Sequence, residues 1–90
     1  MQPITEINET GTESFSVYPN PTIGDLTIKA SNVGSLIIFT ILGQQLIEYN
    51  FNKGQTEFQL PNNIASGVYI GKFKSANGQI LKEVRLVYEP

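Results

Sequence analysis

Apolar and polar residues alternate in short runs along most of the chain. Residues 14–18 and 26–29, for example, carry an apolar side chain at every second position. A period of two residues is that of a β-strand with one buried face, and no segment shows a convincing helical period. We predict strands at residues 14–18, 26–29, 35–42, 45–51, 56–60, 68–74 and 79–88.

The runs are separated by residues that favour turns. Pro19 and Pro21 each fix a φ angle at about −65°, so the chain leaves the first strand extended and then turns. Asn77–Gly78 lies between two runs and is typical of a tight hairpin. The pattern predicts a single all-β domain, a seven-stranded immunoglobulin-like antiparallel β-sandwich that lacks the Cys and Trp residues of true immunoglobulin domains.

The segment 35–42 is apolar on both faces. Leu36 and Ile38 lie on one side of the predicted strand, and Ile37, Phe39 and Ile41 lie on the other. This pattern predicts a central strand, or one covered on both sides. The expected core consists of Phe15, Val17, Leu26, Ile28, Ile37, Phe39, Ile41, Ile47, Tyr49, Phe58, Leu60, Tyr69, Phe73, Val84 and Leu86.

The composition offers little to catalysis. The chain has no Cys and no His, which removes the thiolate metal site, the commonest metal ligand and the commonest general base. Its Ser and Thr residues therefore lack a histidine that could activate them as nucleophiles. We expect a protein that is not an enzyme and has no catalytic, metal-binding or cofactor-binding residues. A net charge of −2 predicts no nucleic-acid partner, and no apolar run is long enough for stable membrane insertion.

Residues 1–13 differ from the rest of the chain. They are rich in Thr, Glu, Asn and Gly and have no sustained periodicity. We predict a flexible linker at 1–13, with a short extra strand at residues 4–7 as the alternative, and a folded domain at 14–90. The N-terminus has neither the basic nor the apolar region of a signal peptide, so we expect any export signal to lie elsewhere in the natural protein.

Four short motifs occur in an order and spacing that resemble a known family. They are Tyr18–Pro21, Leu42–Gln44, Gly67–Ile70 and the lysine-containing last strand at Lys82–Val87. Together they resemble the type IX secretion system C-terminal sorting domain of type A, also called the Por secretion C-terminal domain. The resemblance covers about residues 15–88, nearly all of the predicted folded part.

The resemblance implies a role in protein export. In that family the domain follows an N-terminal cargo protein, which is exported to the periplasm and then directed through the type IX outer-membrane translocon. A surface cysteine protease with sortase-like activity commonly removes the domain, leaving the cargo at the cell surface or outside the cell. By position we expect the cleavage in the polar leader, near Thr10, Gly11 and Thr12.

The motif residues have both a structural and a recognition interpretation. For Pro19, Asn20, Pro21, Gly43, Gln44, Gly67 and Tyr69 we favour the structural one, because prolines and glycines set turns and strand entries. The candidate recognition strand consists of Lys82, Arg85, Leu86, Val87 and Tyr88. A terminal strand can be bound by strand addition, with its basic side chains fixing the orientation.

Two other functions fit the pattern. The first is a non-catalytic binding module for a carbohydrate or protein in a larger extracellular enzyme, with Tyr18, Tyr49, Tyr69 and Tyr88 as a stacking platform. The second is a structural spacer. We expect most of these tyrosines to belong to the core instead, and we expect a sorting domain to lie at the end of its parent protein.

Overall fold

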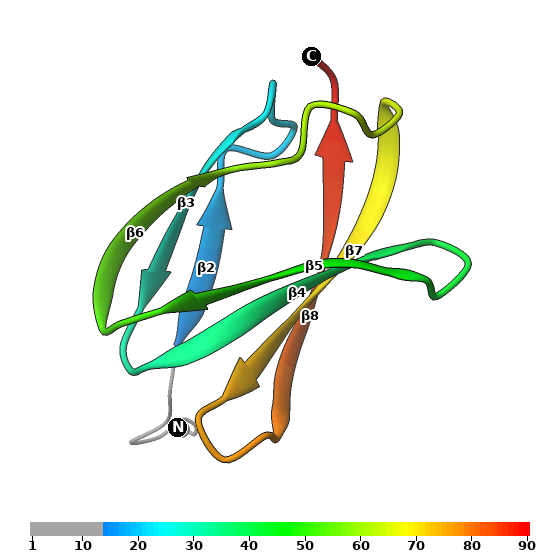
Figure 1. Cartoon of the computed structure of the whole chain (residues 1–90). Helices are drawn as coiled ribbons and strands as arrows, with labels where there is room; N and C mark the ends of the chain where they lie inside the picture. The colour runs from blue at the N-terminus through cyan, green and yellow to red at the C-terminus, as the bar shows by residue number, and fades with distance from the viewer. Residues whose placement is uncertain (1–13) are drawn as a thin grey trace, which may run out of the picture.

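A computed structural model describes residues 14–90 of the chain as an all-β domain (Figure 1). The predictions for residues 1–13, namely the linker, the alternative strand and the cleavage region, lie outside the described residues. The strands are β2 (Phe15–Tyr18), β3 (Asp25–Ala30), β4 (Gly34–Thr40), β5 (Gln45–Phe51), β6 (Gly54–Gln59), β7 (Gly67–Ser75) and β8 (Ile80–Tyr88). No helix in this part of the chain is long and apolar enough to cross a membrane.

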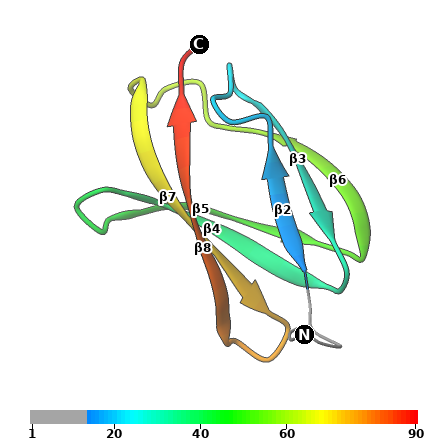
Figure 2. The same ribbon diagram turned by 180° about the vertical axis from the view of Figure 1, so that it is seen from behind.

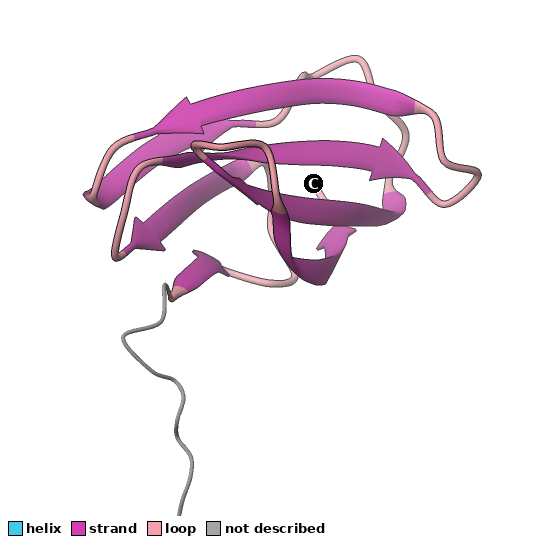
Figure 3. Cartoon of the chain, turned by 90° about the horizontal axis from the view of Figure 1, so that it is seen from below, coloured by secondary structure: helices cyan, strands magenta, loops and turns pink. Residues whose placement is uncertain are grey.

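The strands form two antiparallel sheets. One sheet has the order β2-β3-β6 and the other has the order β5-β4-β7-β8. The two layers are stacked face to face, as Figures 2 and 3 show. Connections that pass from one sheet to the other produce this arrangement, which confirms the predicted seven-stranded sandwich.

The core lies between the two sheets. Phe73 packs against Phe15 with the ring planes nearly parallel and the centroids 5.4 Å apart, and Phe51 meets both rings edge-on. Burial of such apolar side chains is the main force that holds the two sheets together. The largest fully buried side chains are Phe73, Leu26, Ile28, Leu36, Ile38, Leu86 and Thr22.

The prediction for β4 was wrong about which side chains enter the core. Leu36 and Ile38 are fully buried between the sheets, whereas Phe39 is only half-buried and Ile41 is 69% exposed. Ile37 is buried, but on the outer face, because β4 is flanked by β5 and β7. Ile41 lies in the turn that follows the strand, since β4 ends at Thr40.

Several other core predictions also needed adjustment. Phe51, Tyr88 and Ala30 are buried members of the core that the sequence pattern did not single out. Five predicted core residues are partly buried and pack against its margin: Val17, Ile47, Tyr49, Phe58 and Val84. Fewer of the predicted core residues are therefore fully buried than the sequence pattern indicates.

Candidate recognition surface

The segment Pro19–Thr22, which we call the proline segment, joins β2 to β3 and lies beside the last strand. Figure 2 shows the β2–β3 connection next to the C-terminal end of β8. Thr22 forms an isolated parallel bridge with Tyr88. The Thr22 N–H donates to the Val87 carbonyl at 2.8 Å, and the Glu89 N–H donates to the Thr22 carbonyl at 2.8 Å. The proline segment thus bridges one sheet to the edge of the other.

The side chain of Asn20 binds the same edge of β8. Its Nδ2 donates to the Arg85 carbonyl at 2.6 Å, and its Oδ1 accepts from the Val87 N–H at 3.0 Å. Pro19 and Pro21 on either side have no N–H to offer, and both of their preceding peptide bonds are cis. A carboxamide carries one donor and one acceptor in a plane, so Asn20 takes the place of a strand's peptide group.

The side chain of Thr22 anchors the end of the proline segment to the turn before β3. The hydroxyl of this buried residue donates to the Asp25 carbonyl at 2.6 Å and accepts from the Gly24 N–H at 3.0 Å. A buried hydroxyl with both kinds of partner avoids the cost of an unsatisfied polar group. The sequence analysis missed Thr22, although a threonine in a turn is a signal for a bond between its hydroxyl and the backbone N–H two residues on, here that of Gly24.

Lys82 connects β8 to β2 at the other end of the strand. Its Nζ donates to the Phe15 carbonyl at 2.8 Å. Lys82 shares the inward side of β8 with Val84 and Leu86, and its long stem reaches across the margin of the sandwich. Lys82, predicted as a recognition residue, therefore links the last strand to the first described strand.

The other predicted recognition residues divide between the two faces of β8. Leu86 and Tyr88 are buried in the core, whereas Val87 is half-buried and Arg85 is exposed on the outer face. The Arg85 guanidinium forms no salt bridge with any described carboxylate. Of the five, Arg85 and Val87 are the ones whose side chains lie on the outer face of the sheet.

The edge of β8 is occupied over only part of its length. The Arg85 carbonyl, both backbone groups of Val87 and the Glu89 N–H are bound by the proline segment. Backbone groups of alternate residues point to the same side of a strand, so those of Glu83 also face outward. Within residues 14–90 they have no hydrogen-bond partner, which leaves the stretch around Glu83 as the open part of the edge.

Gly67 and Tyr69 lie close to the occupied part of this edge. They pair with Tyr88 and Leu86 across the β7–β8 ladder. Gly67 has a φ of +141°, which other residues rarely adopt, and the Tyr69 hydroxyl donates to the Ala65 carbonyl. The Gly67 backbone angle and the Tyr69 hydrogen bond both fit the structural interpretation of these two motif residues.

Gly43 and Gln44 are not brought to the proline segment. They lie in the turn between β4 and β5, which projects from the body of the sandwich (Figure 1). Gly43 has a φ of +93°, and Thr40 donates its N–H to the Gln44 carbonyl at 2.8 Å. Leu42 at the tip is 93% exposed.

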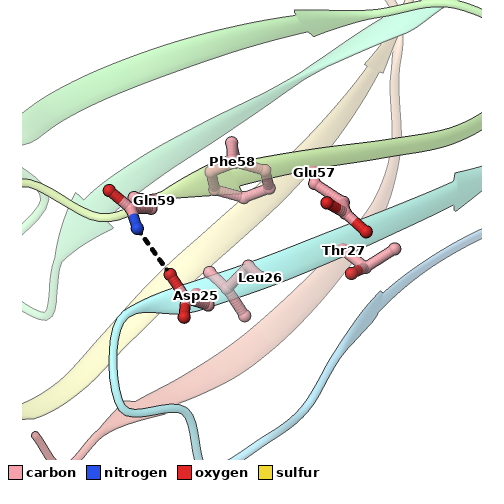
Figure 4. A pocket seen from close by; sticks show the side chains of 6 residues that line it. All are labelled: Asp25, Leu26, Thr27, Glu57, Phe58 and Gln59. Carbon is pink, nitrogen blue, oxygen red and sulfur yellow. Dashed lines mark hydrogen bonds between the residues drawn. The ribbon is translucent and has the colours of Figure 1, made fainter.

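A second, polar surface lies on the outer face of the three-stranded sheet. Figure 4 shows a hollow there in which the Gln59 amide donates to the Asp25 carboxylate at 2.8 Å. Thr27 and Glu57 form the next cross-strand pair on the same face. These groups can form hydrogen bonds, but no group of three or more metal-binding side chains occurs among residues 14–90.

The tyrosines do not form a stacking platform. Tyr69 and Tyr88 are buried, and Tyr49 packs on Phe58 with the ring centroids 3.9 Å apart. Tyr18 is 41% exposed, and its hydroxyl accepts a hydrogen bond from Gln55 Nε2 at 3.1 Å. This arrangement confirms that most of the tyrosines serve the fold.

Comparison with known proteins gives the following similarities. The profile of the family described as the secretion system C-terminal sorting domain matches residues 16–86. The chain is also similar to the ulvan lyase NLR42 of Nonlabens ulvanivorans, with 36% identity over 59 residues. That match covers 63% of this chain but only 11% of the lyase. No solved structure matches the chain.

Proposed function

The chain belongs to the type IX secretion C-terminal sorting domains, and from this membership we propose how it carries an attached protein out of the cell. As a sorting signal it marks a protein for export to the cell surface or the extracellular space. A sorting tail of this kind is not itself catalytic. The chain spans 11% of the length of the larger lyase that it matches, an arrangement that fits a tail attached to a cargo.

The proposal is that the outer side of β8 is the part that the type IX machinery binds. The observation that carries it is the pair of hydrogen bonds by which Asn20 holds Arg85 and Val87. These bonds fix the register of the last strand, so that Arg85 and Val87 point outward at defined positions. Strand addition along the open part of the edge, around Glu83, would then complete the contact.

The remaining steps are part of the same proposal. The attached cargo passes through the periplasm, crosses the outer-membrane translocon and is separated from this domain by a sortase-like cysteine protease at the surface. The cut falls near Thr10, Gly11 and Thr12, in a polar stretch where an extended backbone can enter a protease cleft. The domain is a substrate of that reaction and contributes no catalytic group to it.

A reporter assay tests the proposal. A periplasm-targeted fluorescent protein is fused before residues 1–90 and expressed in a host with an active type IX system. We expect the parent fusion at the surface or in the medium, and we expect Arg85→Ser to lower export about tenfold. Deletion of residues 82–90 is unsuitable, because it also removes Leu86 and Tyr88 from the core.

Lys53→Ser provides the matched control, since Lys53 is an exposed cation in the turn between β5 and β6. It should leave export unchanged. If the folded parent fusion stays in the periplasm, the sorting function is wrong for this chain. If Arg85→Ser is exported as well as Lys53→Ser, the domain sorts but the outer side of β8 is not what is bound.

The cleavage site has a separate test. Replacing Thr10, Gly11 and Thr12 by prolines should leave the reporter exported with the domain still attached, because prolines resist the extended binding mode of a protease cleft. Mass spectrometry of the surface and released fractions distinguishes cut from uncut fusion. Normal cleavage of this variant would place the cut elsewhere.

A further inference from the structure

The outer face of the four-stranded sheet carries apolar side chains that nothing in the described chain covers. Phe39 pairs with Ile70, and Val68 pairs with Val87, so these four lie side by side on this face. Together with Ile41 they form what we call the outer apolar patch. Ile41 is 69% exposed, and Leu42 next to it is 93% exposed. Contiguous exposed apolar groups of this kind are typical of interaction sites.

The patch contains a shallow groove. Phe39, Ile41 and Ile70 are its apolar lining residues, and Gly43 of the β4–β5 turn also lines it. Lys72 and Glu83 line the other side, and the Lys72 ammonium lies 5.0 Å from the centroid of the Phe39 ring. The groove therefore combines a site for an apolar side chain with charged groups at its rim.

The charges at the rim are unbalanced. Lys74 is already paired with Glu48 at 3.2 Å, but no described carboxylate forms a salt bridge with Lys72 or Arg85. Lys72 and Glu83 line the groove, and Arg85 lies beside it because it pairs with Ile70 across the β7–β8 ladder. This part of the face therefore carries two cations and one carboxylate. The excess of positive charge favours an occupant that brings carboxylates.

We propose that the outer apolar patch binds a protein segment whose apolar side chains are flanked by Asp or Glu. The apolar side chain occupies the groove between Phe39, Ile41 and Ile70, and the carboxylates meet Lys72 and Arg85. This proposal goes beyond the sorting function, because it centres on Phe39, Ile41 and Ile70, which lie outside β8. Arg85 and Val87 are shared with the side of β8 that we propose is bound in sorting, so the Ile41 and Leu42 variants, rather than Arg85→Ser, separate the two proposals. It does not require that the partner belong to the secretion machinery.

Two other occupants fit the surface less well. A bilayer with anionic lipids is recognised by clusters of about four or more basic residues. At the groove and beside it, two cations, Lys72 and Arg85, form no salt bridge with a described carboxylate, and Glu83 lies between them. A second copy of the chain would bring the same positively charged rim against itself, since a two-fold contact joins identical patches. Charge repulsion disfavours that contact.

A binding experiment with the folded chain of residues 1–90 tests the proposal. The chain is labelled with ¹⁵N and titrated with three short peptides: alternating Leu and Asp, alternating Leu and Lys, and alternating Ser and Asp. We expect the Leu–Asp peptide to shift the amide signals of Phe39, Ile70 and Lys72. The Leu–Lys peptide should bind about fivefold more weakly, because it loses two surface ion pairs, and the Ser–Asp peptide should not bind.

Variants at the patch make the test specific. Replacing Ile41 and Leu42 together by Ser should abolish the shifts without unfolding the chain, since both side chains are exposed. Val33→Ser is the control, because Val33 is an exposed apolar residue at the opposite end of β4. Arg85→Ser should remove part of the preference for aspartate over lysine.

Several outcomes would overturn the proposal. The first is that the Leu–Asp peptide causes no shifts at the patch, or causes the same shifts in the Ile41 and Leu42 double variant. The second is equal binding of the Leu–Asp and Leu–Lys peptides. Shifts at the patch caused by anionic phosphatidylglycerol vesicles, or by raising the protein concentration alone, would assign the surface to a membrane or to self-association. None of these results bears on whether the reporter fusion is exported, so failure here is distinguishable from failure of the sorting function.

Discussion

The two long sides of the sandwich are closed in different ways. On the side where β2 faces β8, the connection consists of polar groups: Asn20, Thr22 and Lys82 all bond to backbone atoms across the gap. On the side where β5 faces β6, the connection is aromatic. Tyr49 packs on Phe58, and its hydroxyl donates to the Gln59 carbonyl at 2.6 Å. We call these the polar side and the aromatic side.

The difference follows from where the strands lie in the chain. β5 and β6 are consecutive and joined by a short turn at Asn52 and Lys53, so the chain itself keeps them close. The polar side joins β2 to β8, and its hydrogen bonds link residues 65 to 67 positions apart. Closing such a long loop costs conformational entropy, so this side depends on specific bonds.

The polar side and the aromatic side also differ in the residues that are candidates for recognition. The motif residues of the proline segment and the candidate recognition strand meet on the polar side, whereas the aromatic side contains none of them. The bonds that bring the two ends of the folded domain together therefore also set the position of the strand that we propose is bound. Weakening the polar side should affect both stability and export, and weakening the aromatic side should affect stability alone.

The largest effect is expected from Asn20→Ala. This variant removes both hydrogen bonds to β8 and leaves the edge groups of Arg85 and Val87 to water. We expect the free energy of unfolding to fall by about 1–3 kcal/mol, as for the loss of a pair of structural hydrogen bonds. Urea unfolding followed by circular dichroism measures it.

Asn63→Ala is the control for this variant, because Asn63 is exposed and lies in the loop before β7. It should change the free energy of unfolding by less than about 0.5 kcal/mol. Equal stabilities of Asn20→Ala and Asn63→Ala would mean that the polar side is not held by the Asn20 carboxamide.

A smaller effect is expected from Lys82→Met. Methionine keeps most of the apolar stem and removes the ammonium that donates to the Phe15 carbonyl. Because the contact is only partly buried, we expect a loss of about 1 kcal/mol in the free energy of unfolding. Lys29→Met, on the outer face of β3, should be nearly neutral by the same measurement. A Lys82→Met protein as stable as the parent would show that β2 and β8 do not need this bond.

The strands themselves could be predicted from the sequence because their period is local. All seven were expected within a few residues of their observed bounds, since alternation and turn residues act between near neighbours. For β4 the bounds could be predicted, but not which face of the strand enters the core. A strand that is apolar on both sides carries no information about which side faces the core, and a choice displaced by one residue exchanges Leu36 and Ile38 for Ile37 and Phe39.

The candidate recognition surface could be predicted only in part. The alternation of Val84 and Leu86 with Arg85 and Val87 indicates which side chains of the last strand point inward, although Tyr88, which continues this alternation, was not among the expected core residues. The partner of Asn20 could not be found in the same way. An asparagine between two prolines indicates a turn, but nothing near it in the sequence points to a strand 65 residues away. Contacts of this length depend on the assembled fold.

The smallest effect is expected on the aromatic side, from Tyr49→Phe, and it depends on pH. The variant keeps the ring on Phe58 and loses the hydrogen bond to Gln59, which should lower the free energy of unfolding at neutral pH by about 0.5 kcal/mol.

Burial raises the pKa of Tyr49 above its ordinary value of 10.0 in the folded chain. The unfolded chain then releases the proton more readily, so the parent loses stability as the pH rises through and above about 10. Urea titrations from about pH 8 to 11 should show a shallower decline for Tyr49→Phe than for the parent. Parallel curves for the parent and Tyr49→Phe would mean that the hydroxyl is in water and that the aromatic side is closed by the rings alone.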